Sequence, residues 1–443
     1  MEQAYAIDTS QIDTELAETI SETLELIAAA PHSSSLRGRL GMIYDVNHFP
    51  DAARVMYEQA STLDTREFAW WYFGALIDQQ KGDIDRALEK IAHAIEIDSE
   101  YVPAHLHRGN WSLHQDLLDE AMDAFEDAAA LGAGSPSAEG IAQVHLRREE
   151  FEEAVAILVP YAETLPHPQI WRLLSTAYAR LDMNEEAEVA RALSKKVFPM
   201  LWLDPIRQRP NKYVRGFGRR MVYAQSLLKA ERYEDALREL ERLEEIRPND
   251  EALISSFAVA YEKTQQPEKA KDILQRGIEM MPNQFRFYVQ LGDLMYRGGQ
   301  NEDAFMLLTR STEINEHNPE AYERLGSVLM RMERFDEAIA AFEKAIDFGF
   351  SDVAVIRLRI GTIYGFRKQW AEAIDEFSQV VELDPGNENG HLYLAHALIE
   401  KGEIDRAEAT LNWARRLGVD PELLQQADEL IEQNRNQVDS DVP

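Results

Sequence analysis

The chain has 443 residues, more than one compact hydrophobic core usually contains. Its 46 lysine and arginine residues stand against 79 aspartate and glutamate residues, so the formal net charge is −33. This charge argues against nonspecific binding to nucleic acid or to anionic membranes, because both of these are themselves negative. Cysteine is absent, which excludes disulfides, thiol catalysis and cysteine-ligated metals.

The sequence also bears on location. No stretch approaches the roughly 20 apolar residues that an integral membrane span requires. The opening segment, MEQAYAIDTS, lacks the basic and apolar regions of a signal peptide. We therefore expect a cytoplasmic protein. A periplasmic location stays open, because a leader removed beforehand would leave the same sequence.

The first predicted element is an amphipathic helix over residues 11–30, whose apolar residues fall on one stripe. Pro31 follows it. We expect residues 1–33 to form a capping helix that covers the open end of a helical array.

Residues 34–196 then show a repeating pattern of paired helices, which predicts a first array of five units. Each unit has large apolar residues and often a glycine in its first helix, and a small residue near the start of its second helix. The units begin at residues 34, 68, 102, 135 and 168.

The register breaks after this array, because Ala187 and Ala236 are 49 residues apart. Residues 197–216 contain several prolines, which prevent a continuous helix, and are too apolar for a free linker. We expect an ordered joint that lies against one or both arrays. Its basic residues either neutralise acidic helices of the chain itself or form a docking point for an acidic ligand, with Trp202 as a buried anchor. The candidate residues of the joint are Trp202, Arg207, Arg209 and Lys212.

Residues 217–420 predict a second array of six units, in which the pattern is clearest. The small residue that opens each second helix recurs at steps of 34 residues, with one step of 35. These residues are Ala236, Ala270, Ala304, Ala338, Ala373 and Ala407. Residues 421–434 then predict a solvating end helix, because Asp420 and Pro421 are suited to its N-cap and first turn. The rest, up to residue 443, is expected to be a frayed tail.

The unit over residues 319–352 carries the strongest motif. Tyr322, Leu325 and Leu329 fall on one face of its first helix, where Gly326 leaves room for a neighbour, and Phe342 lies on the inner face of the second helix. This order resembles the 34-residue pattern of the tetratricopeptide repeat family. The resemblance implies an all-α, right-handed α-solenoid of about eleven helix-turn-helix repeats that binds other proteins and catalyses no reaction.

The resemblance also implies a site, because in this family the first helices line a concave groove that contacts the partner. The residues at those positions mix polar and apolar groups, which suits an extended or helical peptide. Alternatively, the chain's own residues fill part of the groove. The candidate groove residues are Tyr72, Leu106, Asn110, Gln143, Arg172, Met221, Gln225, Val259, Asp293, Tyr296, Arg297, Glu323 and Arg331.

A basic residue recurs near the end of the first helices. In the second array these residues are spaced by 34, and the first array has two of them. One interpretation is structural, since a cation stabilises the negative end of a helix dipole. The other is a basic ladder that holds an acidic partner segment. The residues are Lys229, Lys263, Arg297, Arg331, Arg147 and Arg180.

No phosphate-binding, metalloprotease, nucleophile-elbow or dinucleotide motif is found in the sequence. We therefore expect no catalytic residue, no metal and no cofactor. The predicted function is a non-enzymatic scaffold or adaptor that binds a protein or peptide in the groove. The alternative is a regulatory subunit of a separately encoded enzyme, with its ligand at the joint. A homo-oligomer is not predicted.

Overall fold

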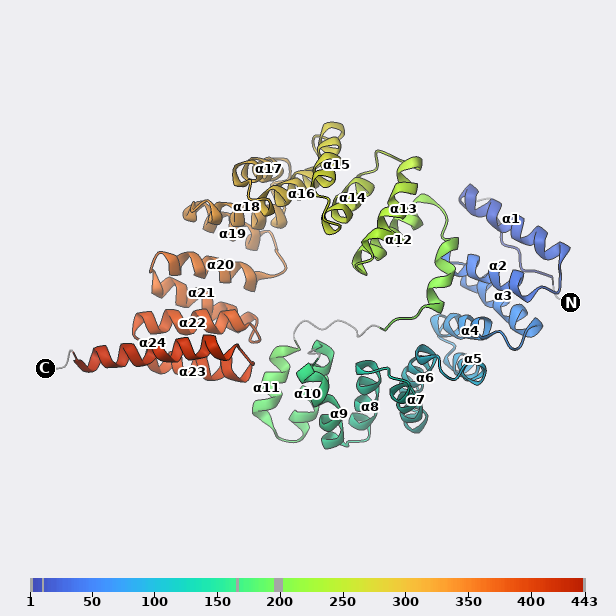
Figure 1. Ribbon diagram of the computed structural model, residues 1–443, viewed down its shortest axis with the longest axis horizontal. Coiled ribbons are helices and arrows are strands. Elements are labelled where there is room, and N and C mark those ends of the chain that lie inside the picture. The colour runs from blue at the N-terminus through green and yellow to red at the C-terminus, as the bar shows by residue number, and fades with distance from the viewer. Residues whose placement is uncertain (1–2, 10–11, 165–166, 195–201, 441–443) are drawn as a thin grey trace. The chain divides into compact units, whose positions relative to one another are not determined.

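The computed structural model describes residues 3–9, 12–164, 167–194 and 202–440, and this part of the chain forms helices and no strands (Figure 1). The predicted all-α class is confirmed. The chain divides into two compact units, residues 1–223 and 224–443, and the division falls inside a helix. The first five residues of the predicted joint, 197–201, lie outside the described residues.

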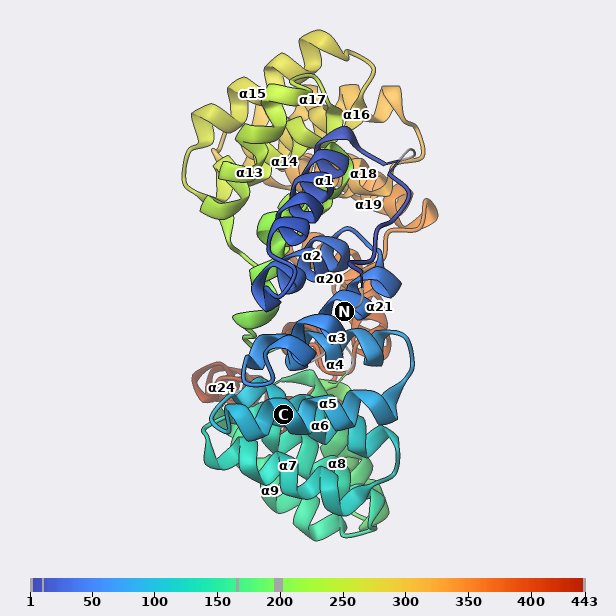
Figure 2. The same ribbon diagram turned by 90° about the vertical axis from the view of Figure 1, so that its right-hand side faces the viewer.

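The first unit begins with α1 (Thr14–Ala29), which packs on α2, as Figure 2 also shows. Helical hairpins follow. Their first helices are α2 (Ser34–Val46), α4 (Phe68–Gln80), α6 (Val102–His114), α8 (Ser135–Arg147) and α10 (Pro168–Arg180). Their second helices are α3 (Pro50–Leu63), α5 (Ile84–Ile97), α7 (Leu118–Ala130), α9 (Phe151–Thr164) and α11 (Asn184–Leu193). The 3-10 helix η1 (Ile206–Tyr213) comes next and packs on α2.

The helix that contains the division is α12 (Phe217–Lys229), and the second unit continues with the same alternation. The other first helices are α14 (Glu251–Lys263), α16 (Phe285–Arg297), α18 (Pro319–Arg331), α20 (Val353–Phe366) and α22 (Glu388–Lys401). The second helices are α13 (Tyr233–Ile246), α15 (Pro267–Met280), α17 (Asn301–Ile314), α19 (Phe335–Asp347), α21 (Trp370–Leu383) and α23 (Ile404–Arg416). The last helix, α24 (Pro421–Ser440), packs on α22 and α23 and continues past residue 434, where we expected it to end.

Several hairpins are held together by a large side chain of the second helix that packs against a glycine of the first. Gly326 shows why the pattern needs a glycine, since a Cβ there would lie 2.6 Å from Cδ1 of Phe342. Gly109 and Phe125 repeat this arrangement in the first unit, again at 2.6 Å. A side chain on either glycine would push the two helices apart, so the 16-residue spacing from glycine to aromatic reports the hairpin itself.

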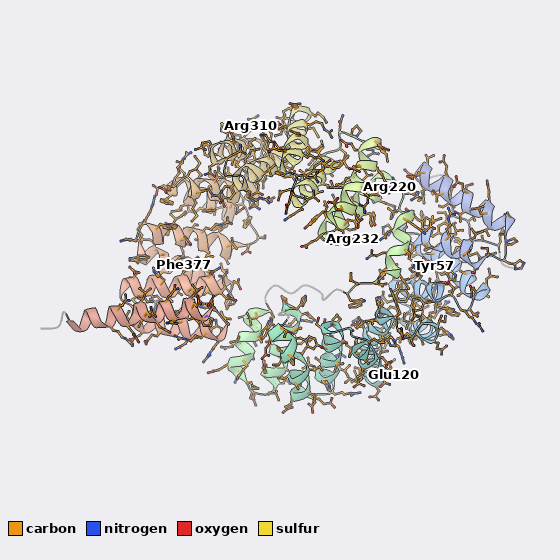
Figure 3. The ribbon with its side chains drawn as sticks, viewed as in Figure 1. Tyr57, Glu120, Arg220, Arg232, Arg310 and Phe377 are labelled. Carbon is orange, nitrogen blue, oxygen red and sulfur yellow. The ribbon has the colours of Figure 1, made fainter. Side chains whose placement is uncertain are left out.

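Neighbouring hairpins also pack on each other, because the second helix of one contacts the first helix of the next, as α17 contacts α18 and α19 contacts α20. Neighbouring first helices also contact each other, as α14 and α16 do. Tyr57 and Phe377, labelled in Figure 3, are buried core residues of the first and second unit. In the first unit, hydrophobic clusters follow one another along the hairpins, as expected for stacked repeats.

Candidate functional site: two faces of first helices

The described part of the joint covers first helices of the first unit. Residues 202–216 run beside α2 and α4 (Figure 1), and their side chains contact α2, α4 and α6. We call the surface beneath them, formed by α2, α4, Tyr101 and α6, the covered face.

Asp204 makes the central contact with the covered face. The buried Tyr72 hydroxyl donates to one carboxylate oxygen at 2.6 Å, and the Tyr101 hydroxyl donates to the other at 2.6 Å. The backbone N–H of Arg207 donates to the carboxylate at 3.1 Å, and His107 Nε2 lies 3.8 Å from it. Burial alone would raise the pKa of Asp204, but the hydrogen bonds from His107, Tyr101 and Tyr72 lower it to about 2.

Further contacts flank this carboxylate on both sides. The Trp202 ring meets the His107 ring edge-on at 5.5 Å, and Ile206 is buried in the core of the first unit. At the far end, the buried Asn47, the C-cap residue of α2, donates to the Tyr213 carbonyl at 3.0 Å and accepts from the Arg215 N–H at 3.2 Å. The joint is therefore fixed at several points along its length.

The basic side chains of the joint divide into two groups. Arg215, together with Arg220 of the following helix α12, pairs with Glu15 of α1 at 3.2 and 3.1 Å, so this end of the joint is tied to α1 within the unit. The three predicted basic residues of the joint are exposed instead. These are Arg207, Arg209 and Lys212.

The covered face changes the interpretation of the groove residues predicted in the first unit. Tyr72 was expected to face an open groove, but it is buried beneath Asp204. Leu106 is buried in a core cluster against which Trp202 packs. Asn110 and Gln143 are half-buried and donate within their own helices, and Arg172 is exposed and donates to Gln169.

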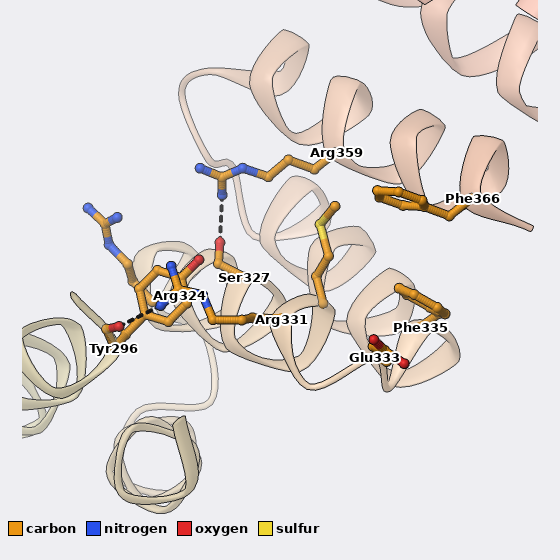
Figure 4. Close-up of a pocket in the computed structure, with 9 residues that line it drawn as sticks. Tyr296, Arg324, Ser327, Arg331, Glu333, Phe335, Arg359 and Phe366 are labelled. Carbon is orange, nitrogen blue, oxygen red and sulfur yellow. Dashed lines mark hydrogen bonds between the residues drawn. The ribbon is translucent and has the colours of Figure 1, made fainter. Parts of the chain in front are cut away.

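The second unit has an open pocket of about 670 Å³ on its first helices, formed by α16, α18, α20 and the start of α19 (Figure 4). We call this the second-unit pocket. It contains two of the predicted groove residues, Tyr296 and Arg331. Its lining residues are Tyr296, Arg324, Ser327, Met330, Arg331, Glu333, Phe335, Arg359 and Phe366.

Aromatic rings form one wall of this pocket. The rings of Phe335 and Phe366 lie 6.4 Å apart and nearly parallel, at an angle of 17°. Phe366 is 70% exposed, which is unusual for so large an apolar side chain. On the other side, Arg331 lies over the Tyr296 ring at 3.6 Å and donates to the Tyr296 carbonyl at 2.7 Å. The pocket thus offers apolar rings beside an exposed cation.

Most of the other charges in and around the pocket neutralise each other. Glu323 is buried, and it pairs with Arg359 and, at 3.4 Å, with Arg324. Arg324 also lies 3.4 Å from Asp293, which is buried and pairs with Arg297. The predicted groove residues Asp293 and Glu323 therefore hold arginines of adjacent first helices and are not themselves open to a partner.

The recurrent basic residues mostly contact the preceding hairpin. Arg147 pairs with Asp116 at 3.2 Å, and Arg180 pairs with Glu149 at 3.5 Å. Arg297 pairs with Glu262 in the same manner. These arginines link consecutive hairpins, which adds a structural role that we did not foresee. Such exposed pairs contribute at most about 1 kcal/mol each.

A second hollow, of about 470 Å³, lies on the first helices α12, α14 and α16 and at the start of α18. It includes the predicted residues Gln225, which is exposed, and Val259, which is half-buried. Met221 lies on the same helix α12, in the part that belongs to the first unit, and is buried. The predicted residues of the second unit thus fall into open and buried sets.

Several residues of these two faces were not predicted. Asp204 had one signal, since it is the only acid within residues 197–216. Phe335 and Phe366 are 31 residues apart, as are Asp116 and Arg147, so this offset joins the end of a first helix to the turn or first residue of the preceding second helix. A search for complementary residues at that spacing would have found the aromatic wall.

Within the described residues, no group of three or more histidine, aspartate or glutamate side chains has the arrangement of a metal site. No described helix combines the length and the hydropathy that crossing a bilayer requires.

Stacked helical hairpins with glycine–aromatic contacts define an α-helical repeat protein. Two family models match the chain, the tetratricopeptide repeat at residues 74–136 and the C-terminal domain of cilia and flagella-associated protein 70 at residues 222–431. The chain belongs to the tetratricopeptide repeat family, as the resemblance in its sequence implied. A comparison with curated proteins found no match.

The solved structures that match the chain share little sequence with it. Yeast Tom70 is 14% identical with a TM-score of 0.40, covering 91% of this chain and 96% of its own. PilF of Pseudomonas aeruginosa is 16% identical with a TM-score of 0.43, covering 48% and 96%. MamA of Desulfovibrio magneticus RS-1 is 19% identical with a TM-score of 0.35, covering 38% and 93%.

Proposed function

We propose that the protein is a non-enzymatic scaffold that binds a segment of a partner protein on the first helices of its second unit. Tetratricopeptide repeat proteins generally mediate protein–protein interactions. The observation that carries the proposal is the second-unit pocket, where an exposed Phe366 and the cation of Arg331 line one cavity.

The chemistry of the pocket indicates the kind of segment that it binds. Rings and a methionine favour an apolar or aromatic anchor, because burying such a side chain supplies most of the binding energy at a hot spot. Arg331 favours an acidic group next to that anchor, since its guanidinium stacks on Tyr296 and is exposed on its other side. The adjacent hollow at Gln225 and Val259 extends the surface for a longer segment.

The proposal includes the organisation of the chain. Residues 34–196 form a first array of five repeats and residues 217–420 a second array of six. Helix α1 caps the first array and α24 caps the second, because each packs on only one side of its unit's hairpins.

Peptide selection by the full chain tests the proposal. A displayed library of random peptides is selected on the wild-type protein, and the selected peptides are titrated against Phe366→Ala and Arg331→Glu variants. We expect a loss of affinity of about tenfold or more for each variant, as for hot-spot residues. Met306→Ala, which removes another exposed apolar side chain from the second helix α17, serves as the control. Equal binding to all variants would refute the proposed site.

A regulatory subunit with its ligand at the joint is the second candidate. The observation that favours it is the exposure of Arg207, Arg209 and Lys212 on η1, inside a strongly acidic chain. Reversing these three charges separates the candidates. Peptides of the second-unit pocket keep their affinity for that variant, whereas an acidic ligand of the joint loses it.

A further inference from the structure

The joint lies on the covered face as a bound peptide lies in a groove. Its side chains alternate, because Trp202, Asp204 and Ile206 face the first helices while Leu203, Pro205 and Arg207 face outward. Leu203 is 85% exposed, although it stands between two anchored residues. This two-residue period is typical of an extended segment that a groove recognises through every second side chain.

We propose that the covered face is a binding site for a segment of another protein with the pattern aromatic-x-Asp-x-aliphatic, and that residues 202–206 occupy this site within the chain. The proposed ligand is defined by the groups that the face presents. A ring packs on His107, a carboxylate bridges Tyr72 and Tyr101, and an aliphatic side chain enters the core cluster of the first unit.

The carboxylate is the part of the ligand that the face specifies most strictly. Burial raises the pKa of the Tyr72 hydroxyl, and burial also raises that of Tyr101, so both hydroxyls stay protonated and act as donors. Without an acceptor between them, two partly or fully buried hydroxyls would lose their partners, which is unfavourable. An amide or an alkyl group in place of the carboxylate would satisfy this arrangement less well.

Backbone recognition accompanies the side-chain contacts. The Tyr101 oxygen that donates to Asp204 also accepts the backbone N–H of Ile206 at 3.1 Å. Tyr101 therefore binds both the carboxylate of Asp204 and the backbone N–H two residues further along the segment. This arrangement fixes the register of the segment, since a shift by one residue would place Leu203 or Pro205 against the two hydroxyls.

Because residues 202–206 of the chain occupy the covered face, a segment of another protein must compete with them. A tethered segment acts at an effective concentration in the millimolar range, so a free segment of equal affinity competes poorly with it. A partner must therefore bind more tightly, or the joint must first be weakened. The covered face thus differs from the second-unit pocket, which is open in the same structure.

The test uses the full chain with its own segment weakened by Trp202→Ala and Asp204→Ala. The probe is a fluorescein-labelled peptide of residues 202–213, WLDPIRQRPNKY, and binding is followed by anisotropy. We expect the double variant to bind the probe at least about tenfold more tightly than the wild type does, because the competing segment has lost its two main anchors. In a probe with Asn in place of Asp204, affinity falls by about tenfold or more, as expected for hydrogen bonds to a charged group.

Two further variants complete the design. Tyr101→Phe, added to the double variant, weakens binding of the acidic probe and leaves the Asn probe nearly unchanged. Phe366→Ala in the second-unit pocket leaves both titrations unchanged, so failure here is distinguishable from failure of the proposed function. If circular dichroism shows that the double variant is unfolded, Asp204→Asn alone replaces it, because this change keeps the size of the side chain. Equal binding of both probes, or no binding to the weakened chain, would overturn the proposal.

Discussion

Replacing Gly326 by alanine tests a glycine–aromatic contact that recurs in several hairpins. The new Cβ would lie 2.6 Å from Cδ1 and 2.7 Å from Cε1 of Phe342, closer than carbon atoms approach in folded proteins. Phe342 is fully buried, so its ring has no free space to enter. Overpacking of this kind costs about 1–3 kcal/mol, while the change from glycine to alanine in a helix contributes about 0.5–1 kcal/mol of stability. The expected net result is destabilisation by up to about 2.5 kcal/mol.

Gly365, one unit further on in α20, provides a matched control. A Cβ at this position would lie 3.8 Å from the Trp370 ring, which is ordinary contact. Gly365→Ala should therefore stabilise the protein by about 0.5–1 kcal/mol.

Urea unfolding followed by circular dichroism measures both variants. Amide hydrogen exchange in α18 and α19 shows whether the effect of Gly326→Ala is local. A local effect is expected because each repeat packs only on its neighbours. A Gly326→Ala protein as stable as the wild type, or a Gly365→Ala protein equally destabilised, would refute the packing argument.

Three further predictions concern the first unit. Tyr101→Phe removes a donor to the Asp204 carboxylate and should lower the free energy of unfolding, measured in urea, by about 1.5–3 kcal/mol. The loss should be smaller in an Asp204→Asn background. Additive losses from the two changes would contradict this contact. Burial raises the pKa of Asp45 to about 6, despite Arg207 nearby, so the folded state loses stability as pH rises from about 4 to 6. Asp45→Asn should therefore add about 1–3 kcal/mol at pH 8 and nothing near pH 3.5 in thermal melts; equal gains at both pH values would show that the charge is not the cause. Arg147→Ala breaks only an exposed pair, so a loss above about 1 kcal/mol on chemical denaturation would be unexpected.

The hairpins could be predicted from sequence because their contacts are local and periodic. Gly326 and Phe342 are 16 residues apart and meet within one hairpin, so the spacing alone places them together. The all-α class follows from the same periodicity. The length of α24 did not follow, since residues beyond 434 show no apolar stripe that would have extended the prediction.

The path of the joint could not be predicted, because its contacts join residues far apart in the chain. Asn47 meets Tyr213 and Arg215 across more than 160 residues, and nothing in their local sequence pairs them. Tyr72 shows the consequence. Its place in α4 was expected to make it a groove residue, and it does lie on that face, but the joint covers it.

The site of the second unit was predictable in part. Tyr296 and Arg331 follow from their positions in the first helices, and both line the pocket. Asp293 and Glu323 occupy similar positions but are buried against arginines, which sequence position alone does not reveal. Whether a first-helix residue at these positions is accessible to a partner depends on the length and charge of the side chain that faces it from the neighbouring first helix.

Because the sequence has no cysteine, single thiols can test the account most directly. The account holds that the first helices of the second unit are open to a partner, whereas the joint covers first helices of the first unit. A single thiol is introduced by Phe366→Cys or, separately, by Leu106→Cys, and its rate of reaction with a maleimide is measured with and without a wild-type-selected peptide at a concentration that saturates the weakened Phe366→Cys variant. The account predicts fast labelling at position 366 that the peptide suppresses, and slow labelling at position 106 that the peptide does not change. Fast labelling at position 106, or labelling at position 366 that is indifferent to the peptide, would contradict it.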